Sequence, residues 1–306
     1  MDKKIRISSV IFLVFILAAA ILTGCKGGNK AEKEDEQEGK LPENLTEIKQ
    51  DIDQAKKIFN ALPSPLESAQ LIKTAGAEFD EKLLNPVSKQ NTYVTSKAMA
   101  LNLGVYTCDL SFASLYEQTQ LLIDYMNAAK KMADGLGILK AIEQEHIDKL
   151  EENINNKEVI MEVVSQTFMN SNSYLEENGQ TATAATVLVG GWIEGLYIST
   201  QLVDMKEFNG NKLVGRIIDQ KLSIDILIDL LNSSKGNPGV DELLTQVQKL
   251  KAVFDKIKIT TGNVRPEYDQ STNTTVLKSE VTTDMTPEIF GELKNVVAEI
   301  RNSFVN

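Results

Sequence analysis

One stretch of the sequence constrains the fold more than any other: Thr183 to Val203, within the run TATAATVLVGGWIEGLYISTQLV that starts at Thr181. It carries a single charge, Glu194, and its apolar residues cover every side of a helical wheel. A helix that is apolar all round is a buried helix. The sequence therefore predicts a helix at the centre of the molecule, with the other helices packed around it.

The first residues predict a secretory signal peptide. Lys3, Lys4 and Arg6 precede an apolar run from Val10 to Leu22, and Leu-Thr-Gly-Cys follows at residues 22–25. This tetrapeptide resembles the lipobox of bacterial lipoproteins. The resemblance implies that residues 1–24 are removed and that Cys25 is joined to diacylglycerol and then N-acylated. The alternative, an uncleaved membrane anchor, is disfavoured because the apolar run is short for a membrane span.

The segment after the cysteine predicts a flexible acidic tether over residues 25–45, because it is charged, spaced by glycine and poor in residues that could enter a core. The folded domain is then expected over residues 46–306. Two or three acyl chains on Cys25 would anchor the chain stably to a membrane. In Gram-negative lipoproteins an aspartate after the cysteine marks retention in the inner membrane. Lys26 stands there instead, which favours the outer membrane.

Net charge narrows the classes of partner. The whole chain has a formal charge of −11, and removal of residues 1–24 takes away three basic residues and one acidic residue, which leaves 29 − 42 = −13. An acidic body of this kind repels phosphate backbones and anionic lipid headgroups, so nucleic acid is not an expected partner. With Cys25 lipidated, only Cys108 remains, and no internal disulfide is expected.

Beyond residue 46 the pattern predicts a single all-α bundle of about eight or nine helices. Ser64-Pro65-Leu66-Glu67 forms a capping box that starts one helix, which is expected to weaken at Gly76 and resume as far as Asn85-Pro86. Thr286-Pro287-Glu288 is expected to open the last helix. Residues 259–283 differ, being rich in threonine and asparagine with short runs of β-forming residues, and they predict a β-hairpin or a mobile loop.

An internal duplication is suggested when the two most apolar helices are aligned with an offset of 86 positions. Gly104 then falls on Gly190 and Tyr106 on Trp192, followed by leucine and a bulky apolar residue in both helices. A glycine inside a helix costs about 1 kcal/mol relative to alanine, so a repeated glycine indicates close packing of two helices. Chance alignment of two apolar helices is the alternative.

Two motifs give the chain a resemblance to a group of helical lipoproteins of Bacteroides-type bacteria. They are Leu103-Gly104-Val105-Tyr106 followed by Asp109-Leu110-Ser111-Phe112, with Gln118 and Gln120 after them, and Gly190-Gly191-Trp192-Ile193-Glu194-Gly195-Leu196-Tyr197. The group usually has glycine at the position of Thr107 and tyrosine at that of Phe112. The resemblance implies an all-helical fold over most of residues 46–306 and a lipid anchor, but no activity.

Asp109 and Glu194 are the sharpest candidates for chemistry, since each is a carboxylate within an otherwise apolar helix. Such groups cost several kcal/mol to bury unless they are paired or hydrogen-bonded. One hypothesis is a small binding cleft lined by Tyr106, Asp109, Trp192, Glu194 and Tyr197. The two carboxyls could perform acid–base work on a glycosidic bond or bind a cationic or sugar ligand. The other hypothesis, which we favour, is that both acids accept hydrogen bonds and fix helix register.

Other catalytic patterns are weak. Glu143 and His146 have the Glu-x-x-His spacing of a helical metal site, but a di-iron bundle needs that motif twice and His146 is the only histidine. We therefore expect no metal, no cofactor and no histidine-based triad. The sequence favours a lipid-anchored, non-catalytic binding or scaffolding module, with an envelope protein or a small ligand as partner. The alternative is a carboxylate-dependent enzyme, for example one that acts on glycans, using Asp109 and Glu194.

Overall fold

A computed structural model describes residues 62–139, 144–153, 156–261, 265–269, 274–278 and 281–306. All of them belong to a compact unit that extends from Asn44 to Asn306. The predicted signal peptide, Cys25, the tether and residues 46–61 of the expected domain lie outside the described residues.

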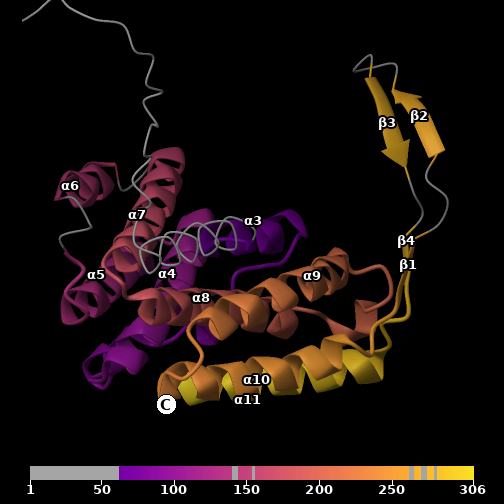
Figure 1. Ribbon diagram of the computed structural model, residues 1–306. Coiled ribbons are helices and arrows are strands. Elements are labelled where there is room, and N and C mark those ends of the chain that lie inside the picture. Colours follow the sequence, from indigo (N-terminus) through magenta and orange to yellow (C-terminus); the bar gives the residue numbers. More distant parts are fainter. Residues whose placement is uncertain (1–61, 140–143, 154–155, 262–264, 270–273, 279–280) are drawn as a thin grey trace, which may run out of the picture. The chain divides into compact units, whose positions relative to one another are not determined.

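The described residues form nine α-helices and short β-ladders, so the predicted all-α class is confirmed (Figure 1). Single 3₁₀ turns occur at η1 (Glu81–Leu83), η2 (Val87–Asn91) and η4 (Met205–Glu207). The helices are α3 (Pro65–Thr74), α4 (Ser96–Leu115), α5 (Thr119–Gly135), α6 (Gln144–Glu152), α7 (Lys157–Glu177), α8 (Thr181–Gln201), α9 (Lys212–Ser233), α10 (Pro238–Phe254) and α11 (Pro287–Val305).

Local sequence signals place several of these helix starts. The Ser64 backbone N–H donates to Glu67 Oε2 at 2.7 Å and the Glu67 N–H donates to Ser64 Oγ at 3.2 Å, which confirms the predicted capping box of α3. Thr286 caps α11, with Pro287 in its first turn, as predicted. These side chains accept N–H groups that have no partner inside the helix, and thereby fix where it begins.

The expectation that the α3 helix resumes beyond Gly76 is wrong. Gly76 has φ +89°, a left-handed conformation that ends the helix, and the chain then forms only the single turns η1 and η2 before α4. Asp80 caps η1, and Asn85 precedes a proline, which disfavours helical backbone at Asn85. The connection from Ala75 to Thr95 is therefore mostly irregular, and it brings Asn85 into the core.

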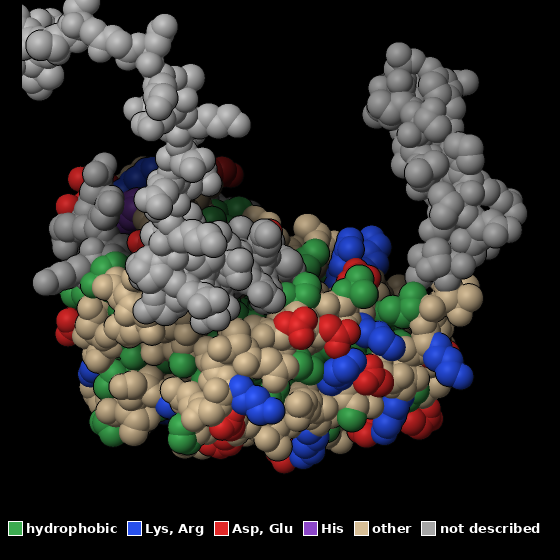
Figure 2. Space-filling view, in the orientation of Figure 1, with side chains coloured by type: hydrophobic (Ala, Val, Ile, Leu, Met, Phe, Trp, Pro, Cys, Tyr) green, Lys and Arg blue, Asp and Glu red, His purple; other side chains and the backbone are tan. Residues whose placement is uncertain are grey.

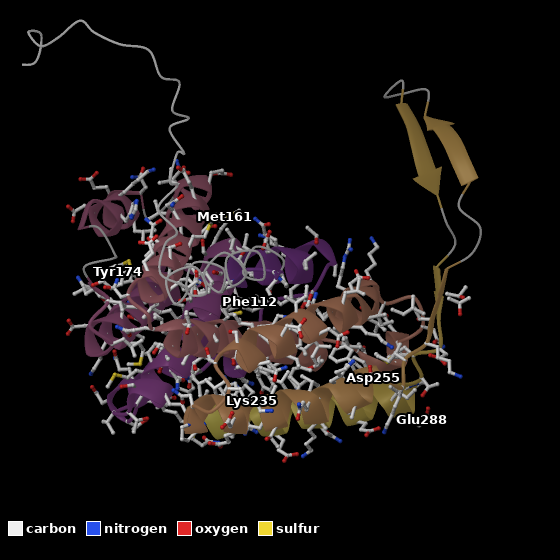
Figure 3. The ribbon with its side chains drawn as sticks, in the orientation of Figure 1. Phe112, Met161, Tyr174, Lys235, Asp255 and Glu288 are labelled. Carbon is white, nitrogen blue, oxygen red and sulfur yellow. The ribbon has the colours of Figure 1, made fainter. Side chains whose placement is uncertain are left out.

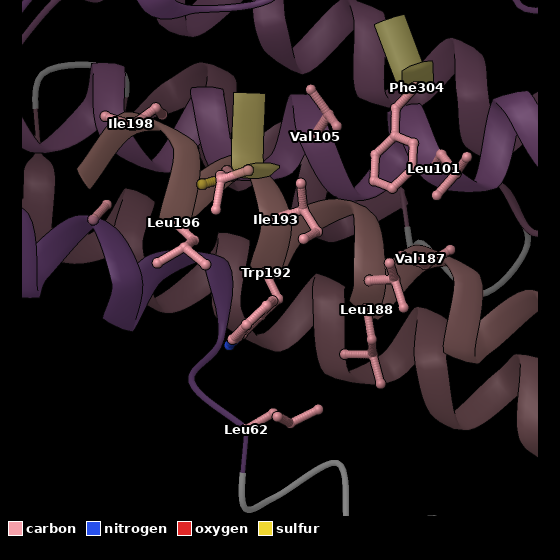
Figure 4. Close-up of a cluster of buried hydrophobic side chains, with 14 of the residues drawn as sticks. Leu62, Leu101, Val105, Val187, Leu188, Trp192, Ile193, Leu196, Ile198 and Phe304 are labelled. Atoms are coloured by element: carbon pink, nitrogen blue, oxygen red, sulfur yellow. The ribbon is translucent and has the colours of Figure 1, made fainter. Parts of the chain in front are cut away.

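The predicted central helix is α8, which packs against α3, α4, α7, α9, α10 and α11. Its residues from Ala184 to Leu196 are all buried. Figure 4 shows Ile193 of α8 beside Val105 of α4, with Phe304 of α11 close to Leu101. Helix α4 is also buried on every side from Ala100 to Leu115, so the two helices that the offset of 86 aligned lie side by side at the centre of the core.

Glycines allow α4 and α8 to approach backbone to backbone. A Cβ added at Gly104 would overlap the carbonyl oxygen of Val187, and a Cβ added at Gly190 would overlap that of Leu101. Val187 is three residues before Gly190, and Leu101 is three residues before Gly104, so each helix contacts the other in the same way. The two carbonyls are also 86 positions apart, which is the offset that aligns the glycines. Reciprocity of this kind is what two equivalent helices related by a local twofold axis would produce. It adds a spatial argument to the predicted duplication.

Two further glycines of α8 allow close contact with α3 as well as with α4. A Cβ added at Gly195 would lie 2.9 Å from Ser68 Cβ of α3 and 3.7 Å from Cys108 Sγ of α4. A Cβ at Gly191 would meet Pro65 Cγ at 3.1 Å. The absence of side chains at these positions thus seats both α3 and α4 on one helix, because small residues let neighbouring helices come close.

The segment predicted as a hairpin or loop forms antiparallel ladders. Strand β1 (Ile259–Thr261) pairs with β4 (Val281–Thr283), with Ile259 opposite Thr283. Strand β2 (Arg265–Asp269) pairs with β3 (Thr274–Lys278), with Arg265 opposite Lys278. The hairpin alternative is the one confirmed.

Charged side chains lie on the outside of the helices (Figure 2). Phe112 is buried among the helices, whereas Lys235, Asp255 and Glu288 are exposed on the side of α9, α10 and α11 (Figure 3). Exposed ion pairs connect neighbouring helices there, such as Lys249–Glu299 at 2.8 Å. Within the described ranges, no helix is both long enough and apolar enough to cross a membrane.

Candidate functional site

Polar side chains meet inside the bundle, where α4, α8, α11 and the connection before α4 come together. All of them are buried, although most of their neighbours are apolar. We call this group the buried polar network, and it consists of Asn85, Tyr93, Asn102, Asp109, Glu194 and Arg301.

Glu194 and Arg301 form the ionic part of the network. Arg301 Nε donates to Glu194 Oε2 and Arg301 Nη2 donates to Glu194 Oε1, both at 2.9 Å. The Glu194 side chain is fully buried, and that of Arg301 is 8% exposed. Arg301 Nη2 also donates to the Leu83 carbonyl oxygen at 3.2 Å, and the guanidinium carbon lies 4.6 Å from the centre of the Tyr197 ring. Arginine suits this place because its planar fork matches a carboxylate with two parallel bonds.

Asp109 is the second acid, and it has no cation of its own. Its Oδ2 accepts the Asn85 backbone N–H at 3.1 Å, whereas Oδ1 has no donor among the described residues. Burial raises the pKa of Asp109 well above its ordinary value, and the Glu194 charge raises it further. A proton on Asp109 accounts for both facts, because a neutral acid needs no cation and a carboxylate with one unpaired buried oxygen would be costly.

One proton and one guanidinium therefore balance two carboxyl groups. Burial raises the pKa of Glu194 too, while the Arg301 charge and hydrogen bonds oppose that rise. Burial lowers the pKa of Arg301 and is the largest single effect on it, but the charge and the hydrogen bonds of Glu194, together with the other neighbouring groups, outweigh burial and keep this pKa above its usual value. Arg301 stays charged at every pH at which the protein folds. The network is electrically neutral only while Asp109 and Glu194 hold one proton between them.

Amide groups extend the network to the end of α11. Asn85 Nδ2 donates to Asn102 Oδ1 and to the Tyr93 hydroxyl, both at 3.0 Å. Asn102 Nδ2 donates to the Phe304 carbonyl oxygen at 2.9 Å, and the Tyr93 hydroxyl donates to that of Val305 at 3.2 Å. The last carbonyls of a helix have no partner within it, so these side chains satisfy groups that would otherwise be buried and unpaired.

The five residues of the predicted cleft are not all in one place. Asp109, Glu194 and Tyr197 meet around Arg301, and the Tyr106 hydroxyl donates to the Pro86 carbonyl oxygen at 3.3 Å. Trp192 lies elsewhere, because its Nε1 donates to Gln220 Oε1 of α9 at 3.1 Å. Tyr106 and both acids have no exposed surface at all, so they border a filled core rather than an open cleft.

Arg301, the partner of Glu194, was missed by the sequence analysis, although a signal for it exists. The apolar face of the last helix includes Val297 and Phe304, and Arg301 is four residues after the first and three before the second. This spacing places a basic residue on the buried face. A buried cation requires an acidic partner from another helix. The sequence offers two acids within otherwise apolar helices, Asp109 and Glu194.

Two sizeable cavities of the described residues lie away from the polar network. One of about 840 Å³ lies between the end of α3 and the α8–α9 connection, with Glu78, Asp204 and Glu207 at its edge. Another of about 570 Å³ lies between α3 and α9 and includes Leu71 and the exposed Leu222. The first is lined by three acidic residues and Lys212, and the charged residues that line the second are Glu67 and Asp219.

The remaining candidates do not form a site in the part of the chain that is described. Glu143 lies outside it, and His146 is on α6, with Nδ1 buried and without a hydrogen-bond partner there. No three His, Cys, Asp or Glu side chains of these residues are grouped as metal ligands. Cys108 is fully buried, and burial raises the pKa of its thiol, followed by the Asp109 and Glu194 charges. A protonated, buried thiol is a core residue and not a nucleophile.

Comparisons of the chain with protein-family models, with curated proteins and with solved structures give no match. The chemistry of the site therefore rests on its own geometry.

Proposed function

We propose that the chain is a lipid-anchored cell-envelope protein whose folded body is a non-catalytic binding or scaffolding module. The Leu-Thr-Gly-Cys sequence at residues 22–25 supports the anchor, at Cys25. Lys26, which stands where an aspartate would mark retention in the inner membrane, favours the outer membrane. The membrane is reached through the lipid, since the acidic body would be repelled by anionic headgroups.

The main observation in favour of a non-catalytic role for the folded domain is the Glu194–Arg301 ion pair. A catalytic carboxylate must reach a substrate, yet both oxygens of Glu194 are engaged by Arg301 and the side chain is fully buried. Asp109 is equally buried, and its Oδ2 accepts the Asn85 backbone N–H. The acids thus have the partners that a structural role requires, and a substrate would have to displace them.

The carboxylate-dependent enzyme is the weaker alternative. It requires two acids on opposite sides of a glycosidic bond, with room between them for a sugar and water. Asp109 and Glu194 instead have no exposed surface, and Arg301 engages both oxygens of Glu194. No observation favours the alternative, and it serves as an outcome of the test.

The anchor is tested by Cys25→Ser in the full-length chain. Wild type should incorporate radiolabelled palmitate and partition into the detergent phase of Triton X-114. The variant should remain unprocessed and unlabelled. Equal labelling and processing of both proteins would reject lipidation at Cys25.

The non-catalytic role of the folded domain is tested by measuring the hydrolysis of a panel of envelope and plant glycans. Wild type is compared with the variants Asp109→Asn and Glu299→Gln. Glu299 is an exposed acid on α11 and serves as the matched control. We expect no turnover by any of the three. Turnover that Asp109→Asn abolishes and Glu299→Gln preserves would establish the carboxylate enzyme instead.

A further inference from the structure

The polar network joins elements that are held together in two different ways. Backbone contact at Gly104 and Gly190 holds α4 on α8, and water cannot replace it. The end of α11 is held to them partly through side-chain hydrogen bonds, from Asn102 to Phe304, from Tyr93 to Val305 and between Arg301 and Glu194. Water can take the place of such partners, because the net contribution of a hydrogen bond is much smaller than the cost of leaving its groups buried and unpaired. A perturbation inside the network should therefore move the end of α11 first.

The charge state of the network depends on one proton. In the described part of the chain, Glu194 of α8 and Arg301 of α11 are the charged groups that act on Asp109. The connection before α4 supplies only the Asn85 N–H. Cys108 of α4, Tyr125 of α5 and the buried tyrosines Tyr93 and Tyr106 are neutral, because burial raises the pKa of each. If the proton leaves, two carboxylates face one guanidinium and the buried site carries a net negative charge.

We propose that a proton on the buried Asp109 is a latch on α11: it keeps the end of this helix closed on α4 and α8, and its loss at higher pH loosens that end. A buried, uncompensated charge is costly, and admitting water lowers the cost. Opening at residues 300–305 admits water beside Arg301 without breaking the glycine contact. This pH-dependent opening of α11 does not require the lipid anchor, and it is a property in addition to the proposed binding or scaffolding role.

The sign of the pH dependence follows from linkage. A folded-state pKa above the unfolded value means that the folded protein retains a proton that the unfolded chain has lost. Stability from this group is therefore fully present below the unfolded pKa of about 3.9 and is lost as the pH rises through the higher folded pKa. The same holds for local opening, so the closed form of α11 weakens with rising pH, by up to about tenfold in its opening equilibrium per pH unit.

The variant Asp109→Asn tests the role of the proton, because asparagine has nearly the same shape as aspartic acid but does not titrate. The Asn oxygen can accept the Asn85 N–H as Asp109 does, and its amide group carries no charge at any pH. The network then stays neutral at every pH. Hydrogen–deuterium exchange of both full-length proteins, read by mass spectrometry from pH 5 to 9, gives the opening of each helix. Comparison at equal pH cancels the intrinsic chemistry of exchange.

We expect the ratio of wild-type to Asp109→Asn exchange in 290–305 of α11 to rise with pH, while the ratio in α10 stays near one. Equal exchange of the two proteins at every pH would overturn the latch. A parallel rise in α10 would also overturn it, since that outcome means global destabilisation. If Asp109→Asn does not fold, wild type alone decides: exchange in α11 relative to α10 must increase with pH, and a constant ratio rejects the proposal.

Discussion

The contact between α4 and α8 has two parts that differ in what holds them. At Gly104 and Gly190 the backbones touch, and both partners of the contact are within the two helices. About one turn further along, Asp109 and Glu194 depend on groups from elsewhere, Asn85 and Arg301. The first part is a matter of shape and the second a matter of charge. They should therefore fail in different ways: added volume breaks the first, and an unpaired partner breaks the second.

The largest effect is expected from Gly190→Leu. The first added carbon already overlaps the Leu101 carbonyl, which is backbone of a buried helix and cannot turn aside. The loss should exceed the roughly 1–3 kcal/mol typical of overpacked cores, to the point that no cooperative thermal unfolding is seen. Gly215→Leu in α9 is the matched control, because nothing lies within 4 Å of a Cβ at Gly215. If the two variants melt alike, α4 and α8 do not cross at Gly190.

Arg301→Met breaks the second part of the contact. It removes the cation and leaves Glu194 buried beside Asp109, which should cost about 3–5 kcal/mol in free energy of unfolding measured in urea. The same loss is expected for Glu194→Met, which leaves Arg301 unpaired. Both changes together remove the unpaired charge, so the double variant should be more stable than the sum of the two losses predicts. Additive losses would show that the two side chains do not act as a pair.

Asn102→Leu tests the link between the network and α11 without changing any charge. Leucine has nearly the shape of asparagine but cannot serve the Phe304 carbonyl or the Asn85 amide. Groups left buried and unpaired cost about 1–3 kcal/mol, so the melting temperature should fall by several degrees. Gln166→Leu is the control, because its bond to Asn170 is exposed. A loss no larger than that of the control would mean that water reaches the end of α11.

The same contrast explains how much could be predicted from sequence. The central helix, the close approach at Gly104 and Gly190 and the caps of α3 and α11 depend on residues near each other in the chain or on a repeated pattern. They were predicted correctly. The acids were located too, but their surroundings were not. Arg301 is 107 residues from Glu194, and no local pattern states which acid it meets.

The connection before α4 shows the second limit. Helical spacing around Phe79 and Leu83 suggested a continued helix, but Gly76 and Pro86 prevent it. The irregular chain places the Asn85 N–H on Asp109, a contact set by tertiary packing and not by propensity. Trp192 was misplaced for a related reason. It is near Glu194 in sequence, yet on a helix a separation of two residues points side chains to different faces.

The smallest effect is expected at an ion pair that resembles Glu194–Arg301 in everything except burial. Lys249 Nζ lies 2.8 Å from both oxygens of Glu299, which is two residues from Arg301 on α11. The side chains of Lys249 and Glu299 are 54% and 67% exposed, so water and salt screen their attraction. Both long side chains also lose conformational freedom when they form the ion pair. Glu299→Gln should cost at most about 1 kcal/mol in free energy of unfolding, a loss that 1 M NaCl removes. The loss in Arg301→Met should persist in that salt, because the buried acid has no contact with the ions. Equal salt sensitivity of the two variants would contradict the distinction between the exposed and the buried pair on this helix, and with it the view that burial makes Arg301 indispensable.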